Sequence, residues 1–198
     1  MFIGTTNTRS MGFNTTKYTP LNTDPQAHPW SQQANLSSLW RKHVAIVALN
    51  PNINLEFIES HEDKRILIAF ATNNLTKQKL CIIGVYISPQ FKESKSQWET
   101  LKNIPITNIT VVASDFYTWT DKLRDTFPVK DRPHHKGATM LQYMASKGLI
   151  FTLDDKEEGP ATLTQWEYNI DDIPLKGSRL DYILVARALA HITSRHNL

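Results

Sequence analysis

The stretch that most constrains the fold is residues 177–185, which read Gly-Ser-Arg-Leu-Asp-Tyr-Ile-Leu-Val. This run is typical of a β-strand, and it places Arg179 and Asp181 where the strand begins. A second apolar run, residues 109–114, ends directly before Asp115. Side chains at strand ends are held by rigid backbone yet reach the rim of a sheet, where metal and phosphate chemistry is usually done. The two aspartates are therefore candidate site residues.

The composition indicates one ordinary globular domain. At 198 residues, the chain is long enough for one domain with a substantial core and short for two. The net charge of +3 permits contact with a polyanion. However, Lys and Arg are interleaved with acids, which is typical of a solvated surface and not of a dedicated basic face.

The single cysteine, Cys81, excludes an intrachain disulfide and a cysteine-cluster zinc site, and we expect no disulfide-linked partner. Its apolar neighbours predict a buried strand thiol. No apolar run approaches the ~20 residues that span a bilayer, and the N-terminus lacks a secretory-signal pattern. We therefore expect no membrane contact and an intracellular location, nuclear or cytoplasmic.

The pattern of the chain changes near residue 41. Residues 1–40 are rich in Thr, Asn, Ser and Gln and predict a polar, poorly structured N-terminal segment, whereas residues 41–198 form the predicted domain. Helices are predicted over residues 92–102 and 139–147, the second ended by Gly148 as a C-cap. Strands are predicted over residues 43–49, 55–60, 65–72, 80–87, 109–113, 149–153, 162–166 and 180–186. This mixture predicts an α+β or α/β sandwich of layers.

Three motifs follow one another in an order that resembles the endonuclease/exonuclease/phosphatase superfamily. Residues 178–182 resemble its Ser-Arg-Ile-Asp-Tyr strand, residues 115–117 its Gly-Asp-Phe-Asn motif, and residues 85–89 its Val-Tyr-Ala-Pro motif. The resemblance covers about residues 41–187 and is greatest to the endonuclease domains of LINE-type non-LTR retrotransposons. It implies a DNase-I-like four-layer α/β sandwich, with two mixed β-sheets packed face to face and outer helices, here incomplete.

The resemblance also implies a metal-dependent phosphodiesterase that uses Mg²⁺ and acts on DNA. The matched positions imply catalytic roles for Asp115, Asp181 and Tyr86, and phosphate or substrate contacts for Tyr117, Thr164, Ser178 and Arg179. Thr162 is an equally good match for the threonine. Tyr117 stands where the superfamily has an asparagine, a shorter side chain that donates a neutral hydrogen bond.

Three parts of the superfamily site have no counterpart in this sequence: an asparagine on an early strand, the metal-binding glutamate and the catalytic histidine. Glu56 and Glu59 fall too late to match the metal-binding glutamate, and His191 and His196 fall too early to match the catalytic histidine. The metal ligands are therefore unassigned, and we expect a domain clipped at both ends with impaired or no activity. The alternative is a non-catalytic remnant that binds nucleic acid or a protein partner through the old groove. A small-molecule or lipid phosphate substrate also stays open, because such folds host several phosphoesterases.

Several of these residues also have ordinary structural interpretations. Asp181 could be a strand-end residue paired with Arg179 or with a backbone amide. His134 and the adjacent histidine resemble a metal site, but neighbouring residues of a strand face opposite ways, and a solvated loop is the commoner arrangement. Trp119 and Trp166 could stack on bases, although packing in a core or rim is the commoner role of tryptophan.

Overall fold

The computed structural model describes residues 3–4, 37–41, 43–61, 64–121, 125–128, 136–152, 165–169 and 173–190. The chain divides into two compact units. The first unit contains Met1–Tyr86 and Ile109–Ser114, and the second contains Ile87–Asn108 and Asp115–Leu198. No helix in the described part of the chain is both long and apolar enough to cross a membrane. Most of the polar segment 1–40 lies outside the described residues, so its lack of structure stays a prediction.

The first unit contains a small antiparallel sheet of order β1-β3-β2. Its strands are β1 (Ile3–Gly4), β2 (Ser38–Trp40) and β3 (Ala45–Ala48). Ile3 pairs with Ala48, and Trp40 pairs with Ala45. The sequence pattern predicted β3, but it did not predict β1 and β2, because strands of two and three residues are too short to show alternation.

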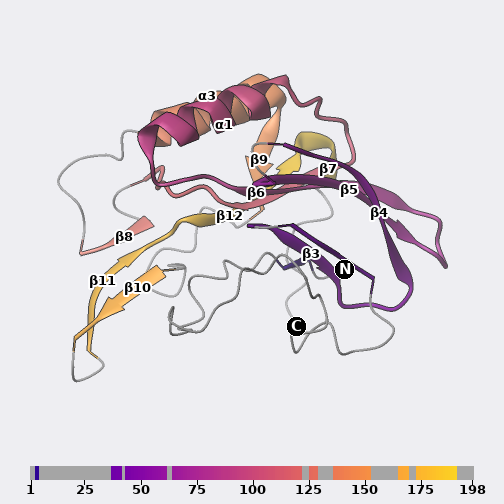
Figure 1. Cartoon of the computed structure of the whole chain (residues 1–198), viewed down its shortest axis with the longest axis horizontal. Helices are drawn as coiled ribbons and strands as arrows, with labels where there is room; N and C mark the ends of the chain where they lie inside the picture. Colours follow the sequence, from indigo (N-terminus) through magenta and orange to yellow (C-terminus); the bar gives the residue numbers. More distant parts are fainter. Residues whose placement is uncertain are drawn as a thin grey trace. The chain divides into compact units, whose positions relative to one another are not determined.

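The first unit also holds four hydrogen-bonded strands in the order β4-β5-β6-β7, with only the last residue of β7 assigned to the second unit. They are β4 (Ile53–His61), β5 (Ile66–Asn73), β6 (Lys79–Tyr86) and β7 (Thr110–Asp115), and each was predicted from its apolar run. β5 pairs antiparallel with both β4 and β6 (Figure 1). All six residues of β7 are buried, as expected for a central strand covered on both faces.

The two sheets of the first unit share one core. Alternate residues of β3 to β6 point into it, as the period-two pattern of strands requires. The buried members are Val44, Ile46, Ala48, Ile53, Leu55, Leu67, Ala69, Ala71, Ile82 and Tyr86, with Leu39 packed against them. A Cβ atom at Gly84 would lie 2.6 Å from the Cγ1 atom of Val44, so glycine allows the sheets to approach closely here.

The second unit contains the two predicted helices, α1 (Phe91–Asn103) and α3 (Gly137–Lys147), which lie side by side (Figure 1). Trp98 and Leu101 form part of the buried face of α1, as their spacing predicted. Gly148 ends α3 with a φ of 63°, which confirms the predicted left-handed C-cap.

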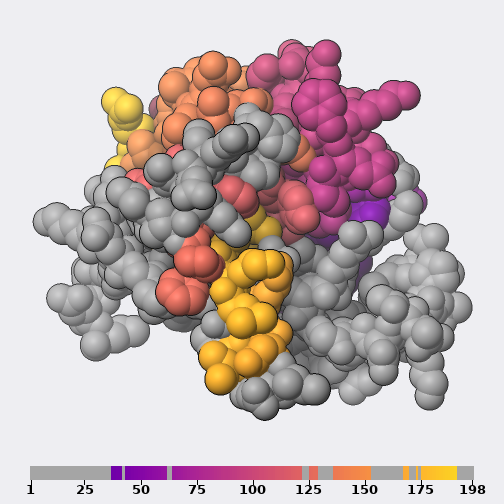
Figure 2. Space-filling model, turned by 90° about the vertical axis from the view of Figure 1, so that its left-hand side faces the viewer, coloured from indigo at the N-terminus to yellow at the C-terminus, as the bar shows by residue number. Residues whose placement is uncertain are grey.

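The strands of the second unit fall into two groups. β9 (Leu149–Phe151) and β12 (Asp181–Ala186) pair antiparallel. β8 (Thr126–Phe127), β10 (Gln165–Tyr168) and β11 (Pro174–Ser178) form a separate sheet of order β10-β11-β8. β8 and β11 were not predicted. Figure 2 shows β10 and β11 at the surface, and the side chains of Tyr168, Ile173 and Leu175 are more than half exposed.

Candidate functional site

The structure brings the two strand-end aspartates onto adjoining backbone in the second unit. Asp115 is the last residue of β7, and Asp181 is the first residue of β12. The N–H of Phe116, directly after Asp115, donates to the carbonyl of Leu180, directly before Asp181, at 2.8 Å. Asp115 is buried and Asp181 is half-buried. Two carboxylates from distant parts of the sequence therefore lie at neighbouring strand ends, as a phosphoester site would require.

Tyr117 is bound tightly to the first of these aspartates. Its backbone N–H donates to Oδ1 of Asp115 at 2.9 Å. Its φ is 48°, in the left-handed region that a bulky side chain rarely adopts. The residue is 36% exposed. The backbone of Tyr117 is therefore strained at the position where the superfamily that this sequence resembles has its asparagine.

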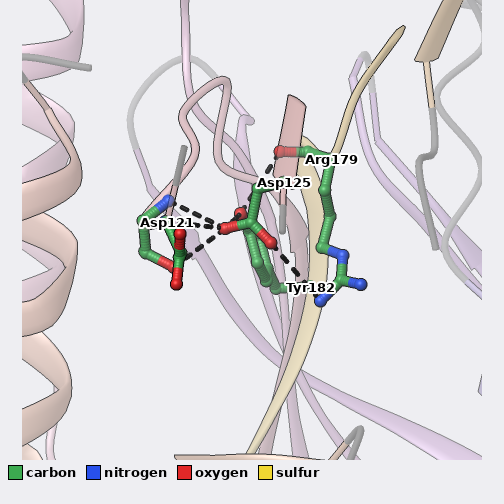
Figure 3. A network of polar contacts seen from close by, with 5 residues as sticks. Asp121, Asp125, Arg179 and Tyr182 are labelled. Carbon is green, nitrogen blue, oxygen red and sulfur yellow. Dashed lines mark hydrogen bonds and ion pairs between the residues drawn. The ribbon is translucent and has the colours of Figure 1, made fainter. Parts of the chain in front are cut away.

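Arg179 of the Ser-Arg-Leu-Asp motif takes part in a buried polar network around Asp125 (Figure 3). Nη1 of Arg179 lies 3.5 Å from Oδ1 of Asp125, and the two residues are 3% and 0% exposed. The backbone N–H of Arg179 also donates to the carbonyl of Asp125 at 2.8 Å. An arginine held in this way contributes to folding and would have to leave its partner before it could contact a phosphate.

The other oxygen of Asp125 is a shared acceptor. Oδ2 accepts from the N–H and the hydroxyl of Thr120, each at 3.0 Å, from the N–H of Asp121 at 2.9 Å and from the hydroxyl of Tyr182 at 3.0 Å. The N–H of Asp125 returns to the carbonyl of Asp121 at 2.8 Å. The carboxylate therefore fastens the segment that follows Asp115 to the start of β12. Sequence reasoning gave Asp125 no role, because this network depends on a loop fold that no periodic pattern signals.

Tyr182 belongs to this network as a neutral hydrogen-bond donor. Burial raises the pKa of its hydroxyl well above the usual value of about 10, and the negative charge of Asp125 and the hydrogen bond to it act in the same direction. Tyr143, fully buried on α3, also has a pKa that burial raises above its usual range. Both hydroxyls are therefore protonated throughout the physiological pH range.

We expect alkaline pH to destabilise the protein for this reason. Above about pH 10 the unfolded chain releases protons that the folded Tyr143 and Tyr182 retain, so stability is complete below that pH and falls as pH rises, by about 1.4 kcal/mol per pH unit for each hydroxyl. Urea unfolding across this range measures the loss. Tyr143→Phe should make the slope less steep by the share of one hydroxyl, and a free energy of unfolding that does not change above pH 10 would contradict the assignment.

An aromatic cluster in the second unit packs around Phe116, the residue that follows Asp115. The rings of Trp98 and Phe116 are stacked, with centroids 5.5 Å apart and planes at 9°. Tyr143 packs against Trp98 at 5.8 Å, and Tyr182 packs against Phe116 at 6.2 Å. The cluster joins α1, α3 and β12 to the residue that follows Asp115, so it fixes the place of that strand end.

Lys136 is a buried lysine directly before α3. Its Nζ donates to the carbonyls of Ser88 and Pro89 at 3.1 and 3.3 Å. Nζ also lies 5.8 Å from the centroid of the Tyr117 ring, within the range of a cation–π contact. Burial lowers the pKa of this lysine. Lys136 thus links Ser88 and Pro89, at the end of the Val-Tyr-Ile-Ser-Pro motif, to the ring of Tyr117.

Tyr86 belongs to the first unit, where it ends β6. Its ring stacks on His43, with centroids 5.5 Å apart and planes at 11°. The guanidinium carbon of Arg65 lies 5.6 Å from the same ring, and the N–H of Tyr86 donates to the carbonyl of Arg65 at 2.9 Å. The orientation of Tyr86 is therefore fixed by its neighbours within the first unit.

The remaining candidates differ in what the structure describes. Ser178 ends β11, is half-buried and pairs with Thr126 of β8. Thr164 and its alternative Thr162 lie outside the described residues. His134 and its neighbour, together with His191 and His196, also lie outside them.

Magnesium prefers an octahedron of oxygen ligands, commonly one or two carboxylates with water and phosphate. The Asp125 carboxylate is already bound by Arg179, Thr120, Asp121 and Tyr182, so it is not a candidate ligand. Among the residues whose placement is described, no three of the His, Cys, Asp and Glu types gather closely enough to hold a metal. The ligands of a magnesium ion are therefore unassigned among the described residues.

Comparisons with known proteins identify the architecture. No model of a protein family matches the sequence, and no curated protein matches it. The endonuclease domain of TRAS1, a telomere-specific non-LTR retrotransposon, matches with a TM-score of 0.53 and 8% sequence identity, over 79% of this chain and 69% of that chain. The AP endonuclease LMAP from Leishmania major matches with a TM-score of 0.53 and 12% identity, over 80% of this chain and 64% of that chain. The chain has a DNase-I-like fold.

This DNase-I-like fold confirms the predicted fold class. The chain spans about two thirds of the length of both matched structures. At such low identity the likeness establishes architecture alone, so function has to be argued from the residues at the strand ends.

Proposed function

We propose that this chain is a DNA endonuclease-like domain of retroelement origin that contacts DNA at the strand ends of Asp115 and Asp181, with impaired or no phosphodiester hydrolysis. The observation that carries the proposal is the 2.8 Å hydrogen bond from Phe116 to Leu180, which joins the two motifs in a DNase-I-like fold. Tyr86, Tyr117, Thr164, Ser178 and Arg179 are the further positions that we assign to this site by resemblance.

Two features of the site support impaired hydrolysis. Tyr117 stands where the Gly-Asp-Phe-Asn motif of the superfamily has asparagine. Its side chain is larger than that of asparagine, and its backbone is strained. Arg179 is buried, and its positive charge is already paired with the carboxylate of Asp125. Loss of individual members of a catalytic unit typically costs orders of magnitude in rate. Mg²⁺ belongs to the proposal through the resemblance, with its ligands unassigned.

One experiment on the full chain tests DNA contact and hydrolysis together. Labelled duplex DNA is incubated with the protein in Mg²⁺ at low salt, anisotropy reports binding, and a denaturing gel of the same samples reports cleavage. We expect weak binding that salt reduces, because few phosphate contacts are available, and we expect intact DNA. Absence of binding at low salt would contradict DNA contact, and cleavage that Asp181→Ala abolishes would contradict impaired hydrolysis.

The second candidate function is a non-catalytic remnant that binds a nucleic acid or protein partner. The observation that favours it is the set of exposed apolar residues in and beside the β10-β11-β8 sheet, namely Phe127, Tyr168, Ile173 and Leu175. Apolar side chains that gather on one exposed sheet often mark an interaction surface. DNA binding that survives Asp115→Ala but is lost in Ile173→Asp would favour this candidate over the first.

A further inference from the structure

The backbone of Tyr117 has a conformation that is unusual for an aromatic residue. Its φ of 48° is costly for a bulky residue, and it lies two residues beyond the strand-end Asp115. Lys64 and Lys77 also have positive φ values, but both lie in turns between neighbouring antiparallel strands. Tyr117 does not lie in a turn of this kind. Its strained backbone lies within the candidate site, two residues after Asp115.

The contacts of Tyr117 determine which of its groups could meet a ligand. The backbone N–H is used by Oδ1 of Asp115 at 2.9 Å and is therefore not a donor for a phosphate. The buried ammonium of Lys136 lies 5.8 Å from the ring centroid and holds the ring by a cation–π contact. Because Lys136 is itself fixed by the carbonyls of Ser88 and Pro89, the ring is pre-oriented before any ligand arrives.

We propose that Tyr117 is a stacking platform for an unpaired nucleobase of a DNA strand bound along the Asp115 and Asp181 strand ends. The inference rests on the proposed function. Tyr117 is 36% exposed and carries an aromatic ring, and bases stack on aromatic faces with little dependence on sequence. Bases inside a duplex have no accessible face, so the preferred ligand is single-stranded DNA or a duplex with an unpaired base.

The test uses the full chain and single-stranded DNA that carries one 2-aminopurine, whose fluorescence falls when the base stacks. We expect quenching and tighter binding than to matched duplex DNA. Tyr117→Leu should abolish the quenching and weaken binding by about fivefold or more, because it removes the ring. Tyr117→Phe should retain both, because it removes only the hydroxyl.

Two variants keep the test decisive. Tyr117→Asn suits the left-handed backbone, so it tests the loss of the ring even if the leucine variant folds poorly. Phe91→Leu replaces another aromatic ring, 70% exposed at the start of α1, and should leave quenching unchanged. Melting curves confirm that each variant is folded.

The outcomes separate this inference from the proposed function. Equal quenching by the wild-type, leucine and asparagine proteins would overturn stacking while leaving DNA contact intact. Loss of binding in Tyr117→Phe equal to that in Tyr117→Leu would overturn it too, because it would assign the contact to the hydroxyl. Failure of the wild-type protein to bind either form of DNA at low salt would overturn the proposed function and the stacking inference with it.

Discussion

Asp125→Ala is expected to lower the free energy of unfolding by about 3–5 kcal/mol. The substitution removes the carboxylate that pairs with Arg179, whose side chain stays buried, and it takes away the acceptor of the Thr120, Asp121 and Tyr182 donors. Removing one partner of a buried pair leaves the other charge without compensation, which costs more than the pair itself contributes. Urea unfolding followed by far-UV circular dichroism measures the loss.

Two controls test whether the loss of stability comes from the buried Asp125–Arg179 pair or from a general change in the loop. Asp121→Ala removes an exposed side chain but keeps the backbone groups that Asp125 uses, and it should change stability by about 0.5 kcal/mol or less. The double variant Asp125→Leu with Arg179→Met should recover the part of the loss that comes from the unpaired charge of Arg179, since apolar residues can replace a buried pair. A loss below about 1 kcal/mol for Asp125→Ala would show that the pair does not stabilise the fold.

Trp98→Ala is expected to lower the free energy of unfolding by a similar amount, about 3–5 kcal/mol. Trp98 is 3% exposed, and its ring packs against both Phe116 and Tyr143. Its removal would leave a cavity between α1, α3 and the strand end that carries Asp115. Thermal and urea unfolding of the purified variant measure the effect.

Phe91→Ala is the matched control on the same helix. Phe91 is 70% exposed, so its truncation should cost about 0.5 kcal/mol or less. Trp98→Phe should cost less than Trp98→Ala, because phenylalanine keeps most of the ring and removes an indole N–H that has no hydrogen-bond partner among the described residues. Equal stability of Trp98→Ala and Phe91→Ala would contradict the packing assigned to this cluster.

Helices and strands could be predicted where apolar and polar residues alternate regularly or where several apolar residues follow one another. β4 to β7 and both helices came from such patterns, and Gly148 marked a helix end correctly. β8 and β11 could not be predicted in this way. β11 reads Pro-Leu-Lys-Gly-Ser, with neither β-branched residues nor alternation, and it is a strand only because β8 and β10 supply its partners.

The residues of the candidate site also differ in whether the sequence alone could predict them. Asp115 and Asp181 were found from the sequence because strand ends are visible in a linear pattern. Asp125 was missed because its partners, Arg179 and Tyr182, are joined to it by the folded path of a loop. Tyr117 was recognised as a departure from the asparagine of the motif. Its strained backbone, however, appears only in the structure.

We propose that this DNase-I-like fold carries the two strand-end aspartates of an endonuclease-like site but hydrolyses DNA poorly or not at all. The most direct test is nicking of supercoiled plasmid in Mg²⁺ with protein in excess, because a single cut changes the form of the whole molecule. We expect wild-type protein and Asp181→Ala to give the same conversion as a reaction without protein. Conversion by wild-type protein that EDTA stops and that Asp181→Ala lowers by about 100-fold or more would contradict it.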